Sequence, residues 1–566
     1  MVFAIIRDLF KVMPYIYLYN QLVYNDDSKS EGIKQIFTSK YSLYFNIDRG
    51  LSSELFDEYI SDLMDQITVF IEDTISQETS IVCFTSKFYQ WIPASIFAYL
   101  IKKKYPHITT IIGGWTNKYA ARSILSSNNI FDYSIWGEGE IPLYYLYQFL
   151  NQQQDIKDVP RIVYRNDYDE VCHTQLTGKS TYIDLNDVNY LKLYDHSEIY
   201  KNSVIPLEKS RGCSWNKCKF CFLSEGYYNR VKTNEVFIDE IKYYINKYNI
   251  YKFMVVDNDF IGSDINLFIE LLQSLAMLKK EHQDFAITMC EIITINLDKD
   301  ILKLMLNAGI ERVQIGIESL SVTLLDEMNK KQSLADNFFF IKNAVELNIY
   351  VAGNIIVGIP SEDDSSVIEN INSLYYLRFI LSQKYFVLSS VNLSIGYNSY
   401  YYRQIKKQNN LDLYSRSDIV THLSDKQTAR VDKSSTFEFS SNQKENVLWE
   451  SFNELLNHYK KHKYSYKIYY KPNSIIYKEY CDRKLIKEIM IDDNLTFFLL
   501  IDLNSKIVIK AEFINKYKSL FDSLENKFDS VLMNLQAEGL IFCHKEQIVS
   551  LISIDVDKIP LNKATH

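Results

Sequence analysis

The sequence predicts the α/β fold class with a small C-terminal domain, on the basis of three observations. Short apolar runs alternate with helical patterns in the first part of the chain. The alternation resumes near residue 196 and continues to about residue 400, and beyond it helical patterns are followed by an alternating strand pair. We therefore expect a doubly wound, Rossmann-like domain over 1–185, a partial (β/α)6 TIM-like barrel over 196–400, a helical connector over 401–470 and a winged-helix-like domain over 471–566.

The composition is that of an ordinary globular protein. The chain has 566 residues, of which 47% are hydrophobic and 23% charged, so it can bury several cores. Its net charge of -9 argues against nucleic acid as the main partner. Eight cysteines in this length are no disulfide scaffold and suit a reducing cytoplasm. Arg7, Asp8 and Lys11 interrupt the apolar start, so we expect a buried strand or helix there, no signal peptide and no membrane span.

The first series of elements predicts a parallel sheet. Short strands are expected over 80–85, 109–114 and 131–136, and a helix over 91–104 separates the first two. The lysines at the end of that helix suit the negative end of its dipole. In such sheets ligands bind at the carboxyl ends of the strands.

The second series predicts the partial barrel. Its candidate strands are 204–209, 251–256, 286–293, 311–317, 350–357 and 386–394. Helices are expected between them, for example over 234–248, 264–279, 298–308 and 334–347. The reactive loops of such barrels follow the C-terminal ends of the strands, so the loop after the first strand is where an active site is expected.

That loop contains Cys213, Cys218 and Cys221, spaced C-x4-C-x2-C. Three thiolates without a fourth partner nearby can hold a metal cluster at three corners and leave one corner open for chemistry. The spacing alone leaves three interpretations. They are a 4Fe–4S cluster with an open iron, a zinc ion that takes His196 or Cys290 as fourth ligand, and cysteines that bind no metal.

Several features around this loop resemble a known family. Phe220 precedes the last cysteine, and four later segments lie at or beside the ends of predicted strands. These segments are 255–260, 307–319, 325–330 and 353–362. Together they resemble the radical S-adenosylmethionine (SAM) superfamily over about residues 200 to 400. The usual loop of that family is C-x3-C-x2-C, so the extra residue between Cys213 and Cys218 is a departure from its pattern.

The resemblance implies two cofactors and a role for each loop residue. Cys213, Cys218 and Cys221 would hold a 4Fe–4S cluster, and SAM would bind the open iron and yield a 5′-deoxyadenosyl radical after one-electron reduction. Phe220 would lie beside the adenine, and Asp257 would bind the methionine ammonium group. A reducing partner such as flavodoxin or ferredoxin would supply the electron.

The same resemblance implies roles for residues on the third and fourth barrel strands. Glu291, Gln314 and Glu318 would line the interior near the ribose or the substrate, and Glu318 is a candidate catalytic residue. Structural roles are the alternative, with Glu318 as a strand-end carboxylate and Gln314 as a partner of buried backbone. Cys290 would either face the substrate and donate a hydrogen atom or be a small buried hydrophobe.

The strand ends of the first domain carry small and polar residues. They are Ser86, Gly113, Gly114, Gly137 and Glu138. Glycines there let a flat ligand approach the backbone closely. These strand ends resemble the cobalamin-binding domain that precedes many radical SAM barrels, which implies cobalamin as a cofactor. Residues 1–100 contain no histidine that could hold the lower face of the cobalt, and a degenerate domain that binds nothing is the alternative.

The C-terminal region resembles the ending of several radical SAM maturases of ribosomally made peptides (RiPPs), chiefly over 535–542. The basic stretch 458–471 could dock an acidic leader peptide, or it could be a solvated helix end. The resemblance implies cobalamin-dependent C-methylation of a peptide or natural-product precursor. The alternatives are a cobalamin-independent epimerase or crosslinking maturase, and a zinc-containing binding or regulatory protein.

Overall fold

Two sheets with parallel strands organise the chain, and each lies in its own unit. The computed structural model describes residues 13–45, 48–86, 90–127, 129–174, 178, 181–188, 203–221, 227–396, 399–408, 414–416, 439–441, 447–521 and 524–560. The first unit comprises Met1–Asp184, Phe220–Tyr228 and Ser394–Asn442, and the second comprises Leu185–Lys219, Asn229–Leu393 and Gln443–His566. Among the described residues, no helix is long and apolar enough to cross a bilayer.

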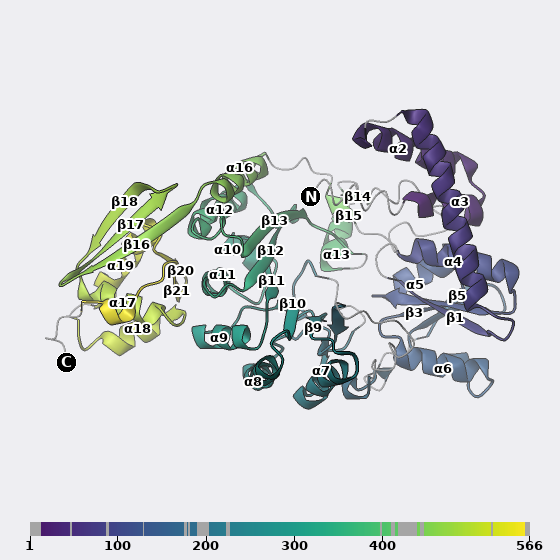
Figure 1. Cartoon of the computed structure of the whole chain (residues 1–566), viewed down its shortest axis with the longest axis horizontal. Coiled ribbons are helices and arrows are strands. Elements are labelled where there is room, and N and C mark those ends of the chain that lie inside the picture. The colour runs from purple at the N-terminus through teal and green to yellow at the C-terminus, as the bar shows by residue number, and fades with distance from the viewer. Residues whose placement is uncertain are drawn as a thin grey trace. The chain divides into compact units, whose positions relative to one another are not determined.

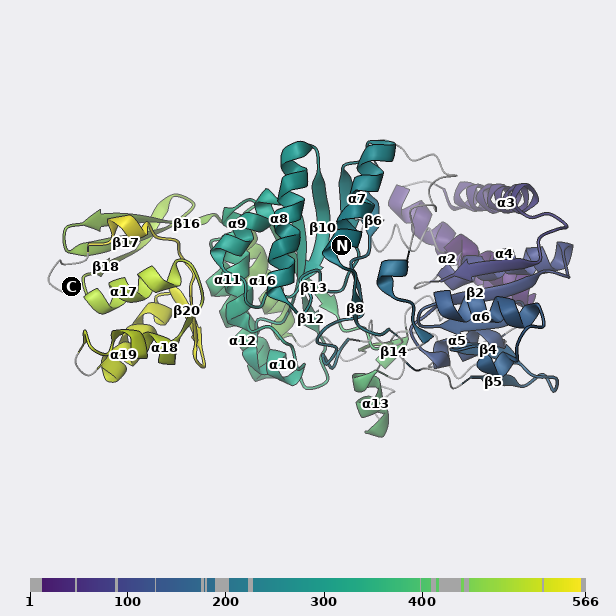
Figure 2. The same cartoon turned by 90° about the horizontal axis from the view of Figure 1, so that it is seen from below.

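The sheet of the first unit has five strands in sequential order (Figures 1 and 2). The strands are β1 (Ile81–Thr85), β2 (Thr109–Trp115), β3 (Tyr133–Trp136), β4 (Ile162–Arg165) and β5 (Val171–His173). The first three are parallel, and β4 and β5 extend the sheet antiparallel. The helices of this unit include α2 (Asp27–Phe45), α3 (Arg49–Thr74), α4 (Trp91–Lys104), α5 (Lys118–Ser127) and α6 (Glu140–Leu150).

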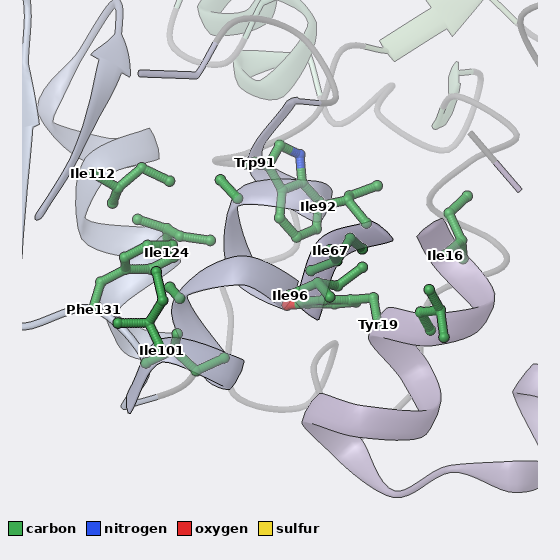
Figure 3. Packing of buried hydrophobic residues seen from close by; sticks show 14 of the residues in the cluster. Ile16, Tyr19, Ile67, Trp91, Ile92, Ile96, Ile101, Ile112, Ile124 and Phe131 are labelled. Carbon is green, nitrogen blue, oxygen red and sulfur yellow. The ribbon is translucent and has the colours of Figure 1, made fainter. Parts of the chain in front are cut away.

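Helices cover both faces of this sheet, as a Rossmann-like fold requires. Successive strand residues point to opposite faces. Ile111 packs in one apolar cluster with Leu146 of α6, whereas its neighbour Ile112 packs in the cluster that contains α4. Figure 3 shows this second cluster, where Trp91 of α4 lies near Tyr19. Their rings meet edge to face with centroids 5.4 Å apart.

The apolar start of the chain is helical where it is described. Residues 13–18 are helical, a π-helical turn follows at η1 (Tyr19–Val23), and Met13 and Ile16 are buried. Residues 1–12 lie outside the described residues.

The second unit contains the expected partial barrel. Its strands are β6 (Ile205–Leu207), β9 (Lys252–Val255), β10 (Ala286–Ile292), β11 (Arg312–Glu318), β12 (Tyr350–Val357) and β13 (Phe386–Asn392). They pair in this order and are all parallel. Helices α7 to α12 form an arc on the outside of the strands (Figure 1). They are α7 (Asn234–Tyr248), α8 (Ile265–Glu281), α9 (Lys299–Asn307), α10 (Val322–Glu327), α11 (Leu334–Glu346) and α12 (Asp364–Ser373).

Side-chain caps fix where these helices begin. Thr233, Asp264, Asp298 and Ser333 accept hydrogen bonds from backbone amides in the first turns of α7, α8, α9 and α11. Such caps satisfy amide groups that the helix itself leaves without partners. The strand-to-helix turns at the carboxyl edge of the barrel therefore have defined geometry.

The expected helical connector over 401–470 is helical only in part. It contains α13 (Tyr400–Lys407) and α16 (Leu448–Lys461), but also the short strands β14 (Tyr414–Arg416) and β15 (Phe439–Ser441). The predicted end of the connector at residue 470 is also wrong, because strand β16 begins at Tyr464. In the Lys/Tyr-rich stretch around 459–471, Tyr464, Tyr466, Ile468 and Tyr470 stand at every second position, which is the period of a strand. Residues 409–413, 417–438 and 442–446 lie outside the described residues.

The C-terminal part consists of a three-stranded antiparallel sheet followed by the expected winged-helix topology. The sheet strands are β16 (Tyr464–Lys471), β17 (Ser474–Cys481) and β18 (Lys484–Ile491). The remaining elements are α17 (Asn494–Leu503), β19 (Val508–Ile509), α18 (Lys510–Tyr517), α19 (Leu524–Ala537), β20 (Ile541–His544) and β21 (Gln547–Ser550). The sheet order β19-β21-β20 places the first short strand beside the last, as in winged helices.

A buried ion pair joins the barrel to the C-terminal sheet inside the second unit. The Arg378 guanidinium donates to both carboxylate oxygens of Glu479 on β17, at 2.8 and 2.9 Å. It also stacks over Tyr375 and Phe379, and the Tyr477 hydroxyl donates to Glu479 at 2.6 Å. Burial tends to raise the pKa of the Glu479 carboxyl, but the hydrogen bonds and charge of Arg378 outweigh it and the pKa is lowered. The pair is therefore ionised and fully partnered.

We expect Glu479→Gln to lower the free energy of unfolding of the second unit by about 3–5 kcal/mol, because it leaves the Arg378 charge buried without its counter-ion. Urea unfolding followed by circular dichroism measures this change. The exposed pair Lys478–Glu488 on the same sheet, 2.9 Å apart, supplies the control. Glu488→Gln should cost less than about 1 kcal/mol. Equal losses in the two variants would contradict the role given to Arg378.

Candidate functional site

A short hairpin closes the base of the cysteine loop. After β6 the chain forms β7 (Ser210–Arg211), which pairs antiparallel with β8 (Arg230–Val231). Cys213, Cys218 and Cys221 lie between these two strands. The thiols of Cys213 and Cys218 are half-buried, that of Cys221 is exposed, and none of the three is in a disulfide.

The buried carboxylate of Asp257 anchors the start of this hairpin. Asp257 follows β9, and its Oδ1 accepts from the Lys209 amide at 2.9 Å, while its Oδ2 accepts from the Ser210 hydroxyl at 2.8 Å. Burial raises the pKa of this carboxyl to about 7, although the hydrogen bonds from Ser210 and Lys209 oppose the shift. Asp257 thus positions the chain that enters the loop. Each oxygen of the carboxylate can accept a further hydrogen bond, so the expected contact with a methionine ammonium group stays a prediction.

Hydrogen bonds between Lys232 and Lys209 hold the chain that leaves the cysteine loop to the chain that enters it. The Lys232 amide donates to the Lys209 carbonyl at 2.8 Å, and the Lys209 ammonium group donates to the Lys232 carbonyl. The buried Lys232 ammonium group in turn donates to Glu240 of α7 at 2.6 Å. Burial lowers the pKa of Lys209 to about 8, with the charge of Asp257 opposing. Residues 209 and 232 therefore hold both ends of the loop together.

The loop itself rests on the turn after α10. The Trp215 indole donates to the Asn329 carbonyl at 2.9 Å, and the Asn329 side-chain amide donates to the Lys217 carbonyl at 3.0 Å. The Lys219 amide donates to the Met328 carbonyl at 2.9 Å. The sequence reasoning recognised the segment 325–330 but missed this contact, because nothing local in either segment specifies the other.

The structure brings together three predicted residues of strands β10 and β11. Glu291 and Gln314 are register partners, and the Gln314 side-chain amide donates to Glu291 Oε1 at 3.3 Å. Glu318, further along β11, accepts from the Lys330 ammonium group at 3.1 Å. Burial and the nearby Glu318 charge raise the pKa of Glu291, and Lys330 opposes them. Lys330, which the sequence reasoning missed, thus partly balances a pair of carboxylates.

A glycine makes room for this ion pair. A Cβ on Gly316 would overlap the Lys330 ammonium group and lie 2.6 Å from Glu318 Oε1. Gly316, Gln314 and Glu318 alternate with the fully buried Val313, Ile315 and Ile317, so they point to the other face of the strand. Glu318 has a φ of 61°, a left-handed conformation that a non-glycine residue rarely adopts. The end of β11 therefore leaves space for the Glu318 carboxylate and its Lys330 partner.

Cys290 lies on the opposite face from these residues. It is fully buried and pairs with Val313, whereas its neighbour Glu291 pairs with Gln314. The strand has a register irregularity between Ile287 and Met289, which sets this alternation. Burial raises the pKa of the Cys290 thiol above its usual range. This position does not support the expected role as a hydrogen-atom donor to a substrate, nor a shared site with Glu291.

In the first unit, the five predicted cofactor residues gather at the carboxyl ends of β1, β2 and β3. They are Ser86, Gly113, Gly114, Gly137 and Glu138. The Ser86 amide donates to the Gly113 carbonyl at 2.9 Å, and the Gly137 amide donates to the Trp115 carbonyl at 2.7 Å. Gly114 has a φ of 94°, and a Cβ there would overlap the Ser86 backbone. The carbonyl of the buried Glu138 accepts from Arg161 at 3.1 Å.

This edge also holds buried polar atoms that have no partner in the described part of the chain. They are the Ser86 hydroxyl and the indole nitrogens of Trp115 and Trp136. Burying such groups without hydrogen bonds costs free energy, so a ligand that satisfies them is favoured at this edge.

Comparison with known proteins assigns the second sheet. The family model of the radical SAM superfamily matches residues 207–374, which begin at the end of β6 and include the cysteine loop, β9 to β12 and their helices. The chain therefore carries a radical SAM domain, the catalytic domain of an enzyme superfamily. We assign the cofactors of that superfamily, a 4Fe–4S cluster and SAM, to this domain.

The curated relatives include several methyltransferases. The hopanoid C-3 methylase of Methylococcus capsulatus is 25% identical over 304 residues, which are 51% of this chain and 55% of that protein. The anaerobic magnesium-protoporphyrin IX monomethyl ester cyclase of Cereibacter sphaeroides is 24% identical over 47% of this chain and 44% of that protein. The cytidylyl-2-hydroxyethylphosphonate methyltransferase of Streptomyces wedmorensis is 25% identical over 45% and 53%. The chain thus spans about half the length of the curated relatives it matches.

Solved structures support the fold. The radical SAM methyltransferase TsrM of Kitasatospora setae, with tryptophan and a SAM analog bound, has a TM-score of 0.53 at 11% identity, over 70% of this chain and 80% of that one. The apo structure of the cobalamin-dependent SAM radical enzyme OxsB has a TM-score of 0.51 at 14% identity, over 83% and 64%. Identities this low establish the fold alone, and they confirm the Rossmann-like and barrel architecture.

The His196 alternative for a zinc site lies outside the described residues. The other proposed fourth ligand, Cys290, is fully buried and is the register partner of Val313.

The raised pKa of Asp257 makes stability depend on pH. Its folded value of about 7 lies above the ordinary 3.8, so between these values the folded carboxyl keeps a proton that the unfolded one loses. We expect the unfolding free energy of the wild type to fall, relative to Asp257→Asn, as pH rises from about 4 to about 7, by about 4 kcal/mol at most. Parallel urea titrations at several pH values measure this difference. A pH-independent difference would show that the carboxyl is not shifted.

Proposed function

We propose that this chain is a cobalamin-dependent radical SAM methyltransferase that acts on a carbon of a peptide or natural-product precursor. The observation that carries the proposal is the combination of a radical SAM domain over residues 207–374 with a glycine-rich sheet edge in the preceding domain. Two of the curated relatives named above are methyltransferases by name, which supports methyl transfer as the reaction.

The residues at the edge of the first sheet fit a large flat cofactor. Gly114 removes the side chain that would block the Ser86 backbone, and the buried Ser86 hydroxyl and Trp115 indole lack partners in the described residues. Ser86, Gly113, Gly114, Gly137 and Glu138 would hold the cobalamin, which when bound supplies a transferable methyl group. Because residues 1–100 contain no histidine, that segment would not provide an imidazole ligand to the cobalt.

In the barrel, the chain's own residues would hold and orient the reacting groups. Cys213, Cys218 and Cys221 would bind the cluster, and the Asp257 anchor would keep their loop in place. Glu318, with Lys330 as its counter-ion, would line the face where the SAM ribose or the substrate lies. Phe220, half-buried beside the last cysteine, would contact the adenine.

The C-terminal sheet supports a peptide substrate. The basic stretch 458–471 forms the end of α16 and the strand β16. In the sheet order β16-β17-β18, β16 is an edge strand. An edge strand has backbone groups that can pair with an extended peptide added as a further strand.

We expect Cys213→Ala to abolish cleavage of SAM to 5′-deoxyadenosine, because a cluster held by two thiolates loses its third protein ligand. The measurement is anaerobic reconstitution with iron and sulfide, followed by chromatography of the products after addition of a reductant. Cys172→Ala, which removes a half-buried thiol on β5 of the other sheet, is the control and should retain cleavage. Cleavage in Cys213→Ala at the wild-type rate would refute the cluster assignment.

Two glycines of the first unit test the cobalamin site. Gly114→Ala places a Cβ 2.8 Å from the Ser86 amide nitrogen at a φ of 94°, whereas a Cβ on Gly32 of α2, outside the proposed site, meets nothing within 4 Å. We expect Gly114→Ala to lose bound cobalamin and to destabilise the first unit by about 1–3 kcal/mol, and Gly32→Ala to keep the cobalamin without destabilising the unit. Cobalamin absorbance per chain and thermal unfolding measure the two effects.

Equal cobalamin content in the two glycine variants would contradict the proposed site. A cobalamin-free protein that still modifies its substrate would instead favour a cobalamin-independent epimerase or crosslinking maturase.

A further inference from the structure

A second group of metal-ligand side chains lies far along the sequence from the cysteine loop, where α16 meets the C-terminal sheet. His462, Cys481 and Asp482 each offer one ligand atom, and these atoms all lie within 4.8 Å of one another. We propose that these residues, with His458 beside them, bind a divalent transition-metal ion, Zn²⁺ being the best match to their chemistry. This inference is independent of the proposed function of the barrel.

The donor set is the one that zinc prefers. Zinc sites in proteins combine imidazole nitrogen, thiolate sulfur and carboxylate oxygen, and structural sites use four ligands in tetrahedral geometry. Two histidines, one cysteine and one aspartate supply that number and those types. Calcium and magnesium would select oxygen ligands alone, so the set argues against them.

His458 lies one helical turn before His462. Residues four apart on a helix lie side by side, and the two rings have their centroids 4.5 Å apart. His458 Nε2 is 3.1 Å from the Tyr464 hydroxyl, and that hydroxyl is hydrogen-bonded to the Cys481 thiol. Tyr464 and Cys481 are register partners on β16 and β17. His458 therefore adjoins the group through both the His462 ring and the Tyr464 hydroxyl.

A tight turn places Asp482 beside the C-terminal end of α16. Asp482 and Arg483 connect β17 to β18 with φ values of 48° and 72°, both left-handed, as a type I′ hairpin turn requires. Asp482 Oδ1 accepts from the Lys463 amide at 2.9 Å, and the Asp482 amide donates to the Lys463 carbonyl at 3.0 Å. The ligands therefore sit on a helix end and a hairpin turn whose geometry is fixed before any metal binds.

Without a metal, His462 and Asp482 form a hydrogen-bonded pair. His462 Nδ1 and Asp482 Oδ2 are 2.6 Å apart. The hydrogen bond to His462, followed by that from the Lys463 amide, lowers the pKa of the Asp482 carboxyl. Two ligands at tetrahedral positions around zinc lie roughly 3.3 Å apart, so binding requires only a small separation of this pair. The half-buried Cys481 and exposed Asp482 leave an entry path for the ion.

A bound ion would connect three elements at one point. It would fasten the end of α16 to the β16–β17 pair and to the turn before β18. Metal binding to the folded state alone stabilises that state. We therefore assign the group a structural role in the C-terminal sheet.

The test uses the full chain with Cys213, Cys218 and Cys221 changed to alanine, so that the cluster loop cannot take up the added metal. Co²⁺, which replaces zinc and reports thiolate ligation by a charge-transfer band in the near ultraviolet, is titrated anaerobically, and Zn²⁺ is then used to displace it. We expect one equivalent to bind with the thiolate band and to raise the melting temperature. Cys481→Ser should remove the band, and His462→Ala should weaken binding by at least about 100-fold.

Two further variants complete the experiment. His458→Ala and Asp482→Asn should each weaken binding by at least about 10-fold. His107→Ala and Cys172→Ser, which remove an exposed histidine and a half-buried thiol of the first unit, are matched controls and should bind as the parent does. Circular dichroism of each metal-free variant checks that it is folded. Absence of the thiolate band in the parent, or its persistence in folded Cys481→Ser, would overturn the proposal.

Discussion

The organisation of the barrel site depends on the hydrogen bonds that the buried carboxylate of Asp257 accepts. It holds the backbone of Lys209 and the side chain of Ser210, which lie between β6 and the cysteines. The loop proposed to bind a cluster through three thiolates needs a fixed base, because disorder at the base would spread the thiolates apart. A carboxylate without these two partners would be costly to bury, so the anchor and the loop stabilise each other.

The second constraint is the close approach of neighbouring segments, which glycines permit in both sheets. Gly114 lets the β2 edge meet the Ser86 backbone, and Gly316 leaves room for the Lys330 ammonium group next to Glu318. Gly353 on β12 does the same for the Ile317 side chain of the adjacent strand. Only 16 glycines occur in the chain, and these three stand where a methyl group would collide with a neighbour. Gly114 and Gly316 thus lie beside Ser86 and Glu318, residues of the candidate cofactor sites.

The C-terminal part is joined to the barrel by charge as well as by packing. The Arg378–Glu479 pair is buried, bidentate and surrounded by aromatic rings. Nearby, Phe542 of β20 packs against Phe338 of α11 with ring centroids 5.0 Å apart. These contacts give the winged-helix-like part a definite attachment to the helices outside the barrel strands. The proposed zinc site lies in the same part of the chain and would tighten the sheet that carries Glu479.

The sequence by itself determined the alternation of strands and helices, the cysteine spacing and the strand-end glycines, because each is a local pattern of periodicity or spacing. It did not determine which face Cys290 takes, since an irregularity between Ile287 and Met289 shifts the alternation. The partners of Asp257 and Lys330, and the meeting of His462 with Cys481, were likewise decided by the tertiary structure. These contacts join residues far apart in the chain, and no local pattern encodes them.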